Sequence, residues 1–191
     1  MLPLNRKIIL ASQSPRRSHL LREAGLSFEI RPTDIPEDFP EDMDVDQVAP
    51  YLARKKAEAA RPWIQSDEIV LASDSVVILE GRIFNKPQDD AEAFAMLRAL
   101  SGKMHRVITG VCLISKTQEM DFSGEAKVFF EPMDDAEIDF YVSTYRPFDK
   151  AGAYAVQEWI GLCKISRIEG TYSNIMGLPM DLVYKALKTF I

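Results

Sequence analysis

Residues 69–79 form a long apolar stretch, rich in β-branched residues, that carries one ionisable side chain, Asp74. Its composition predicts a buried strand over residues 68–79. Alternation along that strand puts Asp74 on the face opposite Ser73 and Ser75. A buried carboxylate is costly unless it pairs with a base or binds a metal ion. Asp74 is therefore the leading candidate for a functional residue, and the alternative is a structural ion pair with a neighbouring lysine or arginine.

Strands and helices are interspersed along the rest of the chain. Further strands are expected at residues 7–12, 27–31, 82–84, 106–115, 120–130 and 159–168. Helices are expected at residues 16–24, 48–60, 89–100, 134–143 and 179–190, and residues 32–46 are expected to form an acidic, proline-rich loop. This mixture predicts an α/β sandwich with a mixed sheet, in a single domain over residues 1–191.

Composition narrows the function classes. The net charge is −6, whereas a protein that binds duplex nucleic acid needs a basic face. No apolar run approaches the roughly 20 residues that cross a bilayer. We therefore expect a soluble cytoplasmic protein that binds neither a nucleic acid polymer nor a membrane. Cys112 and Cys163 lie in apolar runs and are expected to be buried, inert thiols, and the widely separated His19 and His105 suggest no zinc site.

Two hydroxyls and two guanidiniums surround the first predicted strand-to-helix junction. Ser12 and Ser14 precede Arg16 and Arg17, and Ser14 followed by Pro15 is typical of an N-cap and first helical position. Backbone N–H groups at a helix N-terminus favour an anion, so this segment could hold a phosphate. The alternative is a capped surface helix whose arginines are solvated.

Lys56, in the predicted helix 48–60, and Lys86, in a predicted turn, are expected near the ends of the sheet, where they could add positive charge for a triphosphate. Each alone also fits a solvated surface charge. Residues 149–157, DKAGAYAVQ, end in Gln157, whose amide can both donate to and accept from a base. The alternative for this segment is a tight packing crossover in which Asp149 and Lys150 pair with each other.

These clusters, taken in order, resemble the Maf family of nucleotide pyrophosphatases. The resemblance covers nearly the whole chain, and seven stretches in the same order make it highly specific. The matching stretches are LASQSPRRSHLL (10–21), LARKKA (52–57), ASDSVV (72–77), NKPQD (85–89), LSGKMHRVITGV (100–111), DKAGAYAVQ (149–157) and IEGTYSNIMGLP (168–179).

The resemblance implies a mixed twisted sheet with helices on both sides, arranged as two lobes around a positively charged cleft and often dimeric. The layout is similar to that of the inosine triphosphate pyrophosphatases. The implied reaction is hydrolysis of a nucleoside triphosphate between its α- and β-phosphates, with Mg²⁺ or Mn²⁺ as cofactor. A homodimer is accordingly a possible assembly.

The resemblance also assigns roles to residues. The family's catalytic aspartate falls on Asp74, its lysines on Lys56 and Lys86, and an acidic metal ligand on Glu37. Its phosphate and substrate contacts fall on Ser12, Ser14, Arg16 and Arg17.

Base preference follows from the same comparison. The DKAGAYAVQ form resembles the branch that acts on dTTP and UTP, whose specificity positions fall on Arg16, Ser75 and Gln157. The family usually has threonine where this chain has Ser75, which keeps the hydroxyl and lacks the methyl group.

Two other functions share these features. A non-catalytic regulator of cell division or septum formation would bind a nucleotide without cutting it, although a pure binder has no use for a carboxylate beside a polyphosphate. An inosine triphosphate pyrophosphatase would share the chemistry and differ in the base that it accepts.

Overall fold

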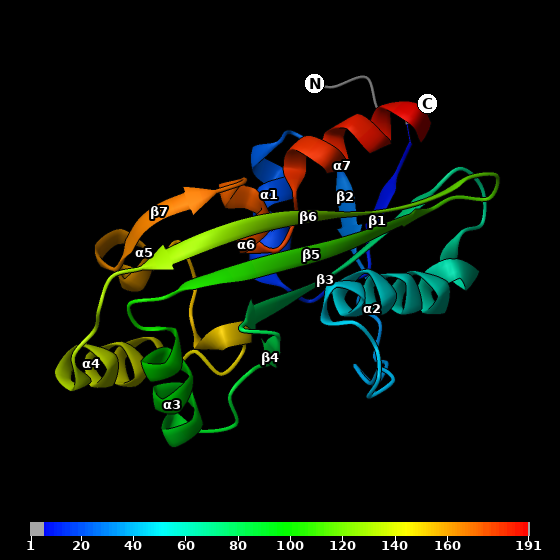
Figure 1. The fold of residues 1–191 in the computed structure, drawn as a ribbon. Helices are drawn as coiled ribbons and strands as arrows, with labels where there is room; N and C mark the ends of the chain where they lie inside the picture. The colour runs from blue at the N-terminus through cyan, green and yellow to red at the C-terminus, as the bar shows by residue number, and fades with distance from the viewer. Residues whose placement is uncertain (1–5, 191) are drawn as a thin grey trace. The chain divides into compact units, whose positions relative to one another are not determined.

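A computed structural model describes residues 6–190, in which strands and helices are interspersed along the chain (Figure 1). The described strands form a seven-stranded sheet in the order β2-β1-β3-β5-β6-β7, with β4 paired to β3. Strand β1 is parallel to β2 and β3, whereas β4 is antiparallel to β3 and β7 to β6. The predicted mixed sheet is thereby confirmed. The strands are β1 (Ile8–Leu10), β2 (Phe28–Ile30), β3 (Ile69–Leu79), β4 (Arg82–Phe84), β5 (Met104–Ile114), β6 (Glu119–Phe130) and β7 (Ile165–Glu169).

Helices of very different length connect these strands. They are α1 (Pro15–Glu23), α2 (Val45–Ala60), α3 (Asp90–Leu100), α4 (Asp135–Tyr145), α5 (Trp159–Cys163), α6 (Tyr172–Met176) and α7 (Met180–Leu187), with 3-10 turns η1 (Arg61–Trp63), η2 (Ala151–Ala153) and η3 (Lys188–Phe190). Between residues 6 and 190, none of the helices combines the length and the apolar character that crossing a membrane demands.

The chain folds as two compact units. Unit 1 contains the described residues up to Asp74, then Thr109–Gly124, and the described residues from Gly177 onward. Unit 2 contains Ser75–Ile108 and Glu125–Met176. Because the divisions fall within β3, β5 and β6, neither unit is one continuous stretch of sequence.

Unit 1 buries both faces of its part of the sheet. Alternation along β1 and β3 sends successive side chains to opposite faces, so each strand supplies two apolar layers. One layer packs against α1 and α7 and includes Ile8, Leu10, Ile69, Leu71, Leu21 and Val183. The other packs against α2 and includes Ile9, Val70, Ala72, Ala53 and Ala57. Helices therefore cover both faces of this part of the sheet, as predicted.

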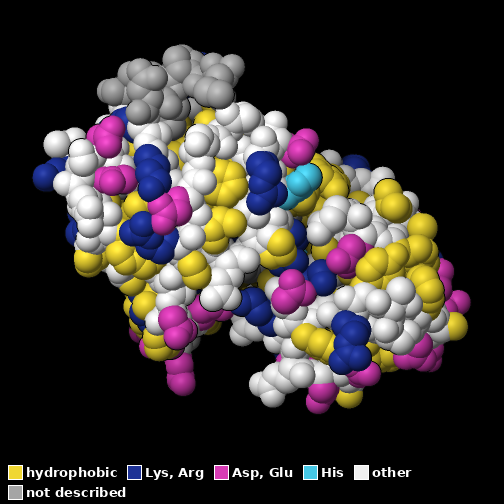
Figure 2. Space-filling view, turned by 180° about the vertical axis from the view of Figure 1, so that it is seen from behind, with side chains coloured by type: hydrophobic (Ala, Val, Ile, Leu, Met, Phe, Trp, Pro, Cys, Tyr) yellow, Lys and Arg dark blue, Asp and Glu magenta, His cyan; other side chains and the backbone are white. Residues whose placement is uncertain are grey.

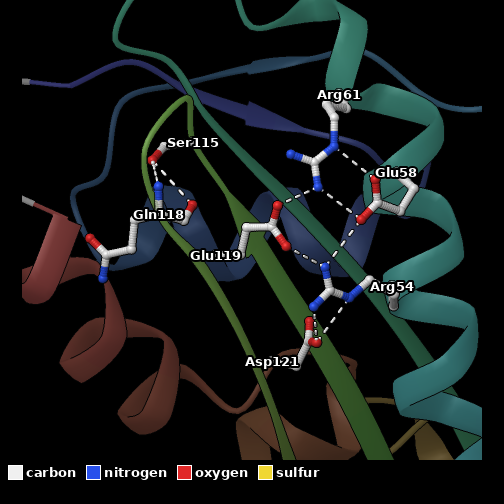
Figure 3. A network of polar contacts seen from close by, with 7 residues as sticks. All are labelled: Arg54, Glu58, Arg61, Ser115, Gln118, Glu119 and Asp121. Atoms are coloured by element: carbon white, nitrogen blue, oxygen red, sulfur yellow. Dashed lines mark hydrogen bonds and ion pairs between the residues drawn. The ribbon is translucent and has the colours of Figure 1, made fainter.

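A network of ion pairs joins the outer side of α2 to β6 (Figure 3). Arg54 contacts Glu119 at 2.7 Å and Asp121 at 2.6 Å, and Arg61 contacts Glu119 at 2.5 Å. Glu58 lies between the two arginines and pairs with both. All of these side chains are more than a third exposed, so solvent screening limits their contribution to stability.

Unit 2 has a single apolar core beneath α3 and α4. Its buried members include Val77, Leu79, Phe84, Leu97, Leu100, Val128, Phe130, Ile138, Tyr141, Tyr154 and Ile160. The turn between β3 and β4 uses two residues with positive φ, Glu80 at 52° and Gly81 at 77°. That geometry suits a two-residue hairpin and confirms the predicted hairpin at this point.

Several predicted boundaries were wrong. The strand predicted at residues 159–168 starts at Ile165, because residues 159–163 form the short helix α5. Periodicity does not separate a strand from a buried helix in so short an apolar run. Helix α2 starts at Val45, before its predicted start, where the Asp44 carboxylate caps it by accepting from the Asp46 N–H at 2.9 Å. Helix α6 was not predicted.

The two cysteines differ from each other. Cys112 is buried in β5 as predicted, whereas Cys163, at the end of α5, is exposed. Cys163 was predicted to be buried because residues 159–168 were predicted to form a buried strand, whereas residues 159–163 form α5.

Candidate active site

The junction between β1 and α1 is organised by the hydroxyl of Ser12. Its oxygen accepts a hydrogen bond from the Ser14 N–H at 3.2 Å and from Nη1 of Arg17 at 3.1 Å. Ser14 occupies the predicted N-cap position with Pro15 after it, but its side chain makes no capping hydrogen bond. Ser12 rather than Ser14 therefore orders this junction, and it holds the guanidinium of Arg17.

A backbone carbonyl ties this junction to β3. The oxygen of Gly177 accepts from Nε of Arg17 at 2.9 Å and from the hydroxyl of the fully buried Ser73 at 3.0 Å. Residues from α1, β3 and the segment before α7 thus meet at one acceptor. The role of Gly177 was not predicted, because a carbonyl oxygen is common to every residue and leaves no signal of residue type.

Asp74 points from β3 toward α2, on the face opposite Ser73. The ammonium of Lys56 donates to Oδ1 of Asp74 at 2.5 Å and to Oε1 of Glu37 at 2.7 Å. Asp74 and Lys56 are only 8% and 9% exposed, whereas the Glu37 side chain is exposed. Asp74 is therefore ion-paired, as the alternative reading required, but its partner also serves a second carboxylate that solvent reaches.

The same region holds the arginines of α1. Burial lowers the pKa of Arg17, the nearby carboxylate of Asp74 opposes that shift, and Arg16 and Glu37 also act on it. The five predicted residues Arg16, Arg17, Glu37, Lys56 and Asp74 thus interact as one cluster of alternating charge within unit 1. Such a cluster can exchange a proton at Asp74 and bind an anion at the guanidiniums.

The other three predicted residues belong to unit 2. Ser75 is partly buried in β3, directly after Asp74 in sequence, while Lys86 and Gln157 are exposed. The Gly152 N–H donates to the Asn85 carbonyl at 3.2 Å, so the turn that carries Lys86 lies against the segment that leads to Gln157.

The surface visible in Figure 2 is not divided into large regions of a single charge. Figure 2 shows one face of the molecule, on which lysine and arginine side chains are interspersed with acidic ones. A local group of bases therefore decides where an anion binds, and the net charge of −6 does not prevent it.

Known proteins match this chain over most of its length. The family model described as Maf-like protein matches residues 7–190. A dTTP/UTP pyrophosphatase of Porphyromonas gingivalis is 48% identical over 187 residues, which cover 96% of this chain and 94% of that protein. A protein of the same name from Parabacteroides distasonis is 44% identical over 185 residues, covering 96% of each chain.

Solved structures were compared as well. The Ham1 protein of Staphylococcus aureus aligns over 65% of this chain and 72% of its own, with 15% identity and a TM-score of 0.48.

Proposed function

This chain belongs to the Maf family, and from that premise we propose that it hydrolyses dTTP and UTP to the nucleoside monophosphate and pyrophosphate. The observation that carries the proposal is the buried carboxylate of Asp74, which shares Lys56 with Glu37 beside two arginines. Curated relatives with 44–48% identity over almost the whole chain are named for this activity.

Asp74 acts on the attacking water as general base, since it is the one buried carboxylate of the cluster. Arg16, Arg17 and Lys56 neutralise the negative charge that develops on the phosphoryl oxygens. Lys86 supplies further positive charge. Ser12 and Ser14 contribute hydroxyls near the N-terminus of α1, which favours an anion. Ser75 and Gln157 recognise the pyrimidine base.

The cofactor that we propose is Mg²⁺ or Mn²⁺. Asp74 and Glu37 offer the oxygen ligands that a hard divalent cation prefers, and they already share one cation, the Lys56 ammonium. Within residues 6–190 no group of three or more such side chains gathers around a metal position. Magnesium usually has only one or two carboxylate ligands from the protein, and substrate phosphates supply others. A pair of carboxylates therefore suits this ion. When bound, the ion would supply Lewis-acid stabilisation of phosphoryl charge.

The alternative, a non-catalytic regulator, has less support. A carboxylate repels a polyphosphate unless water or a metal ion intervenes, so Asp74 would weaken the binding that such a regulator needs. The names of the curated relatives also describe an enzyme.

A substrate panel tests the proposed function. The protein is incubated with dTTP, UTP, ITP, 7-methyl-GTP and ATP, each with Mg²⁺ or Mn²⁺, and the products are separated by anion-exchange chromatography. We expect the monophosphate and pyrophosphate from dTTP and UTP. Nucleoside diphosphate with inorganic phosphate would contradict the bond assignment, preferred cleavage of ITP would indicate the other pyrophosphatase class, and binding without cleavage would favour the regulator.

Replacing Asp74 by asparagine tests the proposed base. Asp74→Asn keeps the shape and removes the charge and the proton acceptor, so turnover of dTTP should fall on the order of a thousandfold. Asp67→Asn, at an exposed aspartate just before β3, is the matched control and should keep wild-type turnover. Circular dichroism checks that both variants fold. Turnover by Asp74→Asn within tenfold of wild type would make Asp74 a structural residue.

A further inference from the structure

The segment that ends in Gln157 is held in an unusual backbone conformation. Gly152 and Ala153 both have positive φ, 68° and 59°. The second value is strained for a residue with a Cβ, and such strain persists only where the surrounding structure holds it. Residues 152–156 are all buried, and Gln157 is the first exposed side chain after them. The strained segment therefore ends by presenting one amide to solvent.

One buried hydroxyl, that of Tyr141 in α4, makes hydrogen bonds to this segment. The Tyr141 oxygen accepts a hydrogen bond from the Ala155 N–H at 3.1 Å and donates one to Oε2 of Glu158. Tyr141 is fully buried, and burial raises its pKa, so the hydroxyl keeps its proton and remains a donor. A single side chain thus fixes the residues on both sides of Val156 and Gln157.

The carboxylate of Glu158 is held at its other oxygen as well. The ammonium of Lys150, itself buried, lies 3.4 Å from Oε1 of Glu158 and 2.9 Å from Oδ1 of Asp149. The Asp149–Lys150 pair foreseen as a packing alternative is therefore present, and Lys150 also joins it to the far end of the segment. With both oxygens of Glu158 engaged, the backbone on either side of Gln157 has little freedom.

We propose that Tyr141 is a positioning residue for base recognition: its hydroxyl, through Ala155 and Glu158, holds Gln157 in the orientation that selects a pyrimidine. This inference rests on the proposed function, in which Gln157 recognises the base. Tyr141 is fully buried, so in this proposal it acts through the segment and not by direct contact with base or phosphate. Its removal should weaken pyrimidine selection and leave the phosphate chemistry of unit 1 intact.

The test compares two tyrosines of the same helix. Tyr141→Phe removes the hydroxyl that serves Ala155 and Glu158. Tyr145→Phe is the matched control, because its ring stacks on Tyr141 at 4.8 Å and the same atom is removed one turn away. Glu158→Leu is a second test variant, which removes the carboxylate that accepts the hydrogen bond from Tyr141.

Binding and turnover are both measured. Calorimetry with Mg²⁺ uses α,β-imido-dUTP and α,β-methylene-ATP, which are not cleaved at the α–β bond, and steady-state kinetics use dTTP and ATP. In Tyr141→Phe we expect affinity for the dUTP analogue to fall on the order of tenfold, with a matching rise in KM for dTTP, because a buried N–H and carboxylate lose their partner. The kcat and the affinity for the ATP analogue should stay within about twofold of wild type.

Each outcome decides the proposal. An unchanged ratio of pyrimidine to purine affinity in Tyr141→Phe, equal losses for both analogues, or the same effect in Tyr145→Phe would overturn it. If Tyr141→Phe does not fold, Glu158→Leu replaces it, and the same ratio of pyrimidine to purine affinity is measured. A wild-type protein that prefers the dUTP analogue but cleaves no triphosphate would refute the proposed hydrolysis alone. A wild-type protein without pyrimidine preference would overturn this inference, whether or not it cleaves triphosphates.

Discussion

His105, in β5, is a neutral histidine enclosed by aromatic rings. It is 1% exposed, and its Nε2 lies 2.7 Å from the Tyr154 hydroxyl. The rings of Phe130 and Tyr154 meet it edge-on, with centroids at 4.8 and 5.3 Å. Nδ1 has no hydrogen-bond partner, and burial lowers the pKa of His105 to about 3. Protonation would leave an uncompensated buried charge, so this residue makes the folded state sensitive to acid.

The direction of this pH dependence follows from the difference between the pKa of His105 in the unfolded and in the folded chain. The unfolded chain takes it up near pH 6.5 and the folded chain only near pH 3, so stability that is complete above pH 6.5 is lost as the pH falls through this range. Between pH 7.5 and 5 we expect His105 to cost about 2 kcal/mol of unfolding free energy. His105→Gln, which can still bond Tyr154, should lack this loss in urea titrations. His19→Gln, on the exposed side of α1, should retain it, and equal pH profiles for both variants would contradict the assignment.

The candidate site was predictable from sequence only where residue type and context disagreed. Asp74 was predictable because a buried charge in an apolar strand needs a partner, and in the structure that partner is the Lys56 ammonium. Tyr141 did not stand out, because an aromatic residue in an amphipathic helix is expected in the core whether or not its hydroxyl does anything. Its two hydrogen bonds depend on a backbone conformation at residues 152–155 that pairwise spacing does not reveal.

Strand β5 and helix α2 approach each other closely at Gly110. A Cβ on Gly110 would sit 2.4 Å from the backbone nitrogen of Pro50 and 2.5 Å from the Ala49 carbonyl. Backbone atoms of a helix cannot move aside singly, so a larger residue must displace α2. That helix carries Lys56, and its approach to the sheet therefore sets how far the ammonium lies from Asp74.

Gly110→Ala tests this contact. Overpacking against a helix backbone should lower the unfolding free energy by about 3 kcal/mol. Gly25→Ala is the control: its φ of +69° is strained for alanine, but nothing lies within 4 Å of the added carbon, so about 1 kcal/mol should be lost. Urea unfolding measures both, and a loss in Gly110→Ala no larger than the control's would show that α2 yields easily.

Elements were predicted well where periodicity and capping agreed and poorly where one was missing. Strands β3 and β5 are long and rich in β-branched residues, and α3 and α4 start at aspartates whose carboxylates cap them. The run that contains α5 has no such signal. Gly161 there packs so closely on the Val156 carbonyl, five residues earlier, that a Cβ would lie 1.8 Å from its oxygen.

Unit 1 is completed by residues 178–190, near the end of the described chain. Its sheet strands lie between residues 8 and 124, yet one apolar layer is closed by Leu178, Val183, Leu187 and Phe190. Sequence patterns predicted an amphipathic final helix but not which face it covers, because that pairing joins residues more than a hundred positions apart. Arg17 and Ser73 of the candidate site share an acceptor, Gly177, in this same returning segment.

Phe190→Ala tests how far unit 1 depends on that closure. Phe190 is 1% exposed, and its removal leaves a cavity against β1 and β3, which should cost about 3–5 kcal/mol. Lys185→Ala, on the exposed side of α7, should change stability by less than about 0.5 kcal/mol. Both are measured by urea unfolding followed by circular dichroism. A loss below 1 kcal/mol in Phe190→Ala would mean that α7 packs without depending on its end. A full loss together with wild-type dTTP turnover at low temperature would separate the stability role of this segment from any role of Gly177 in the site.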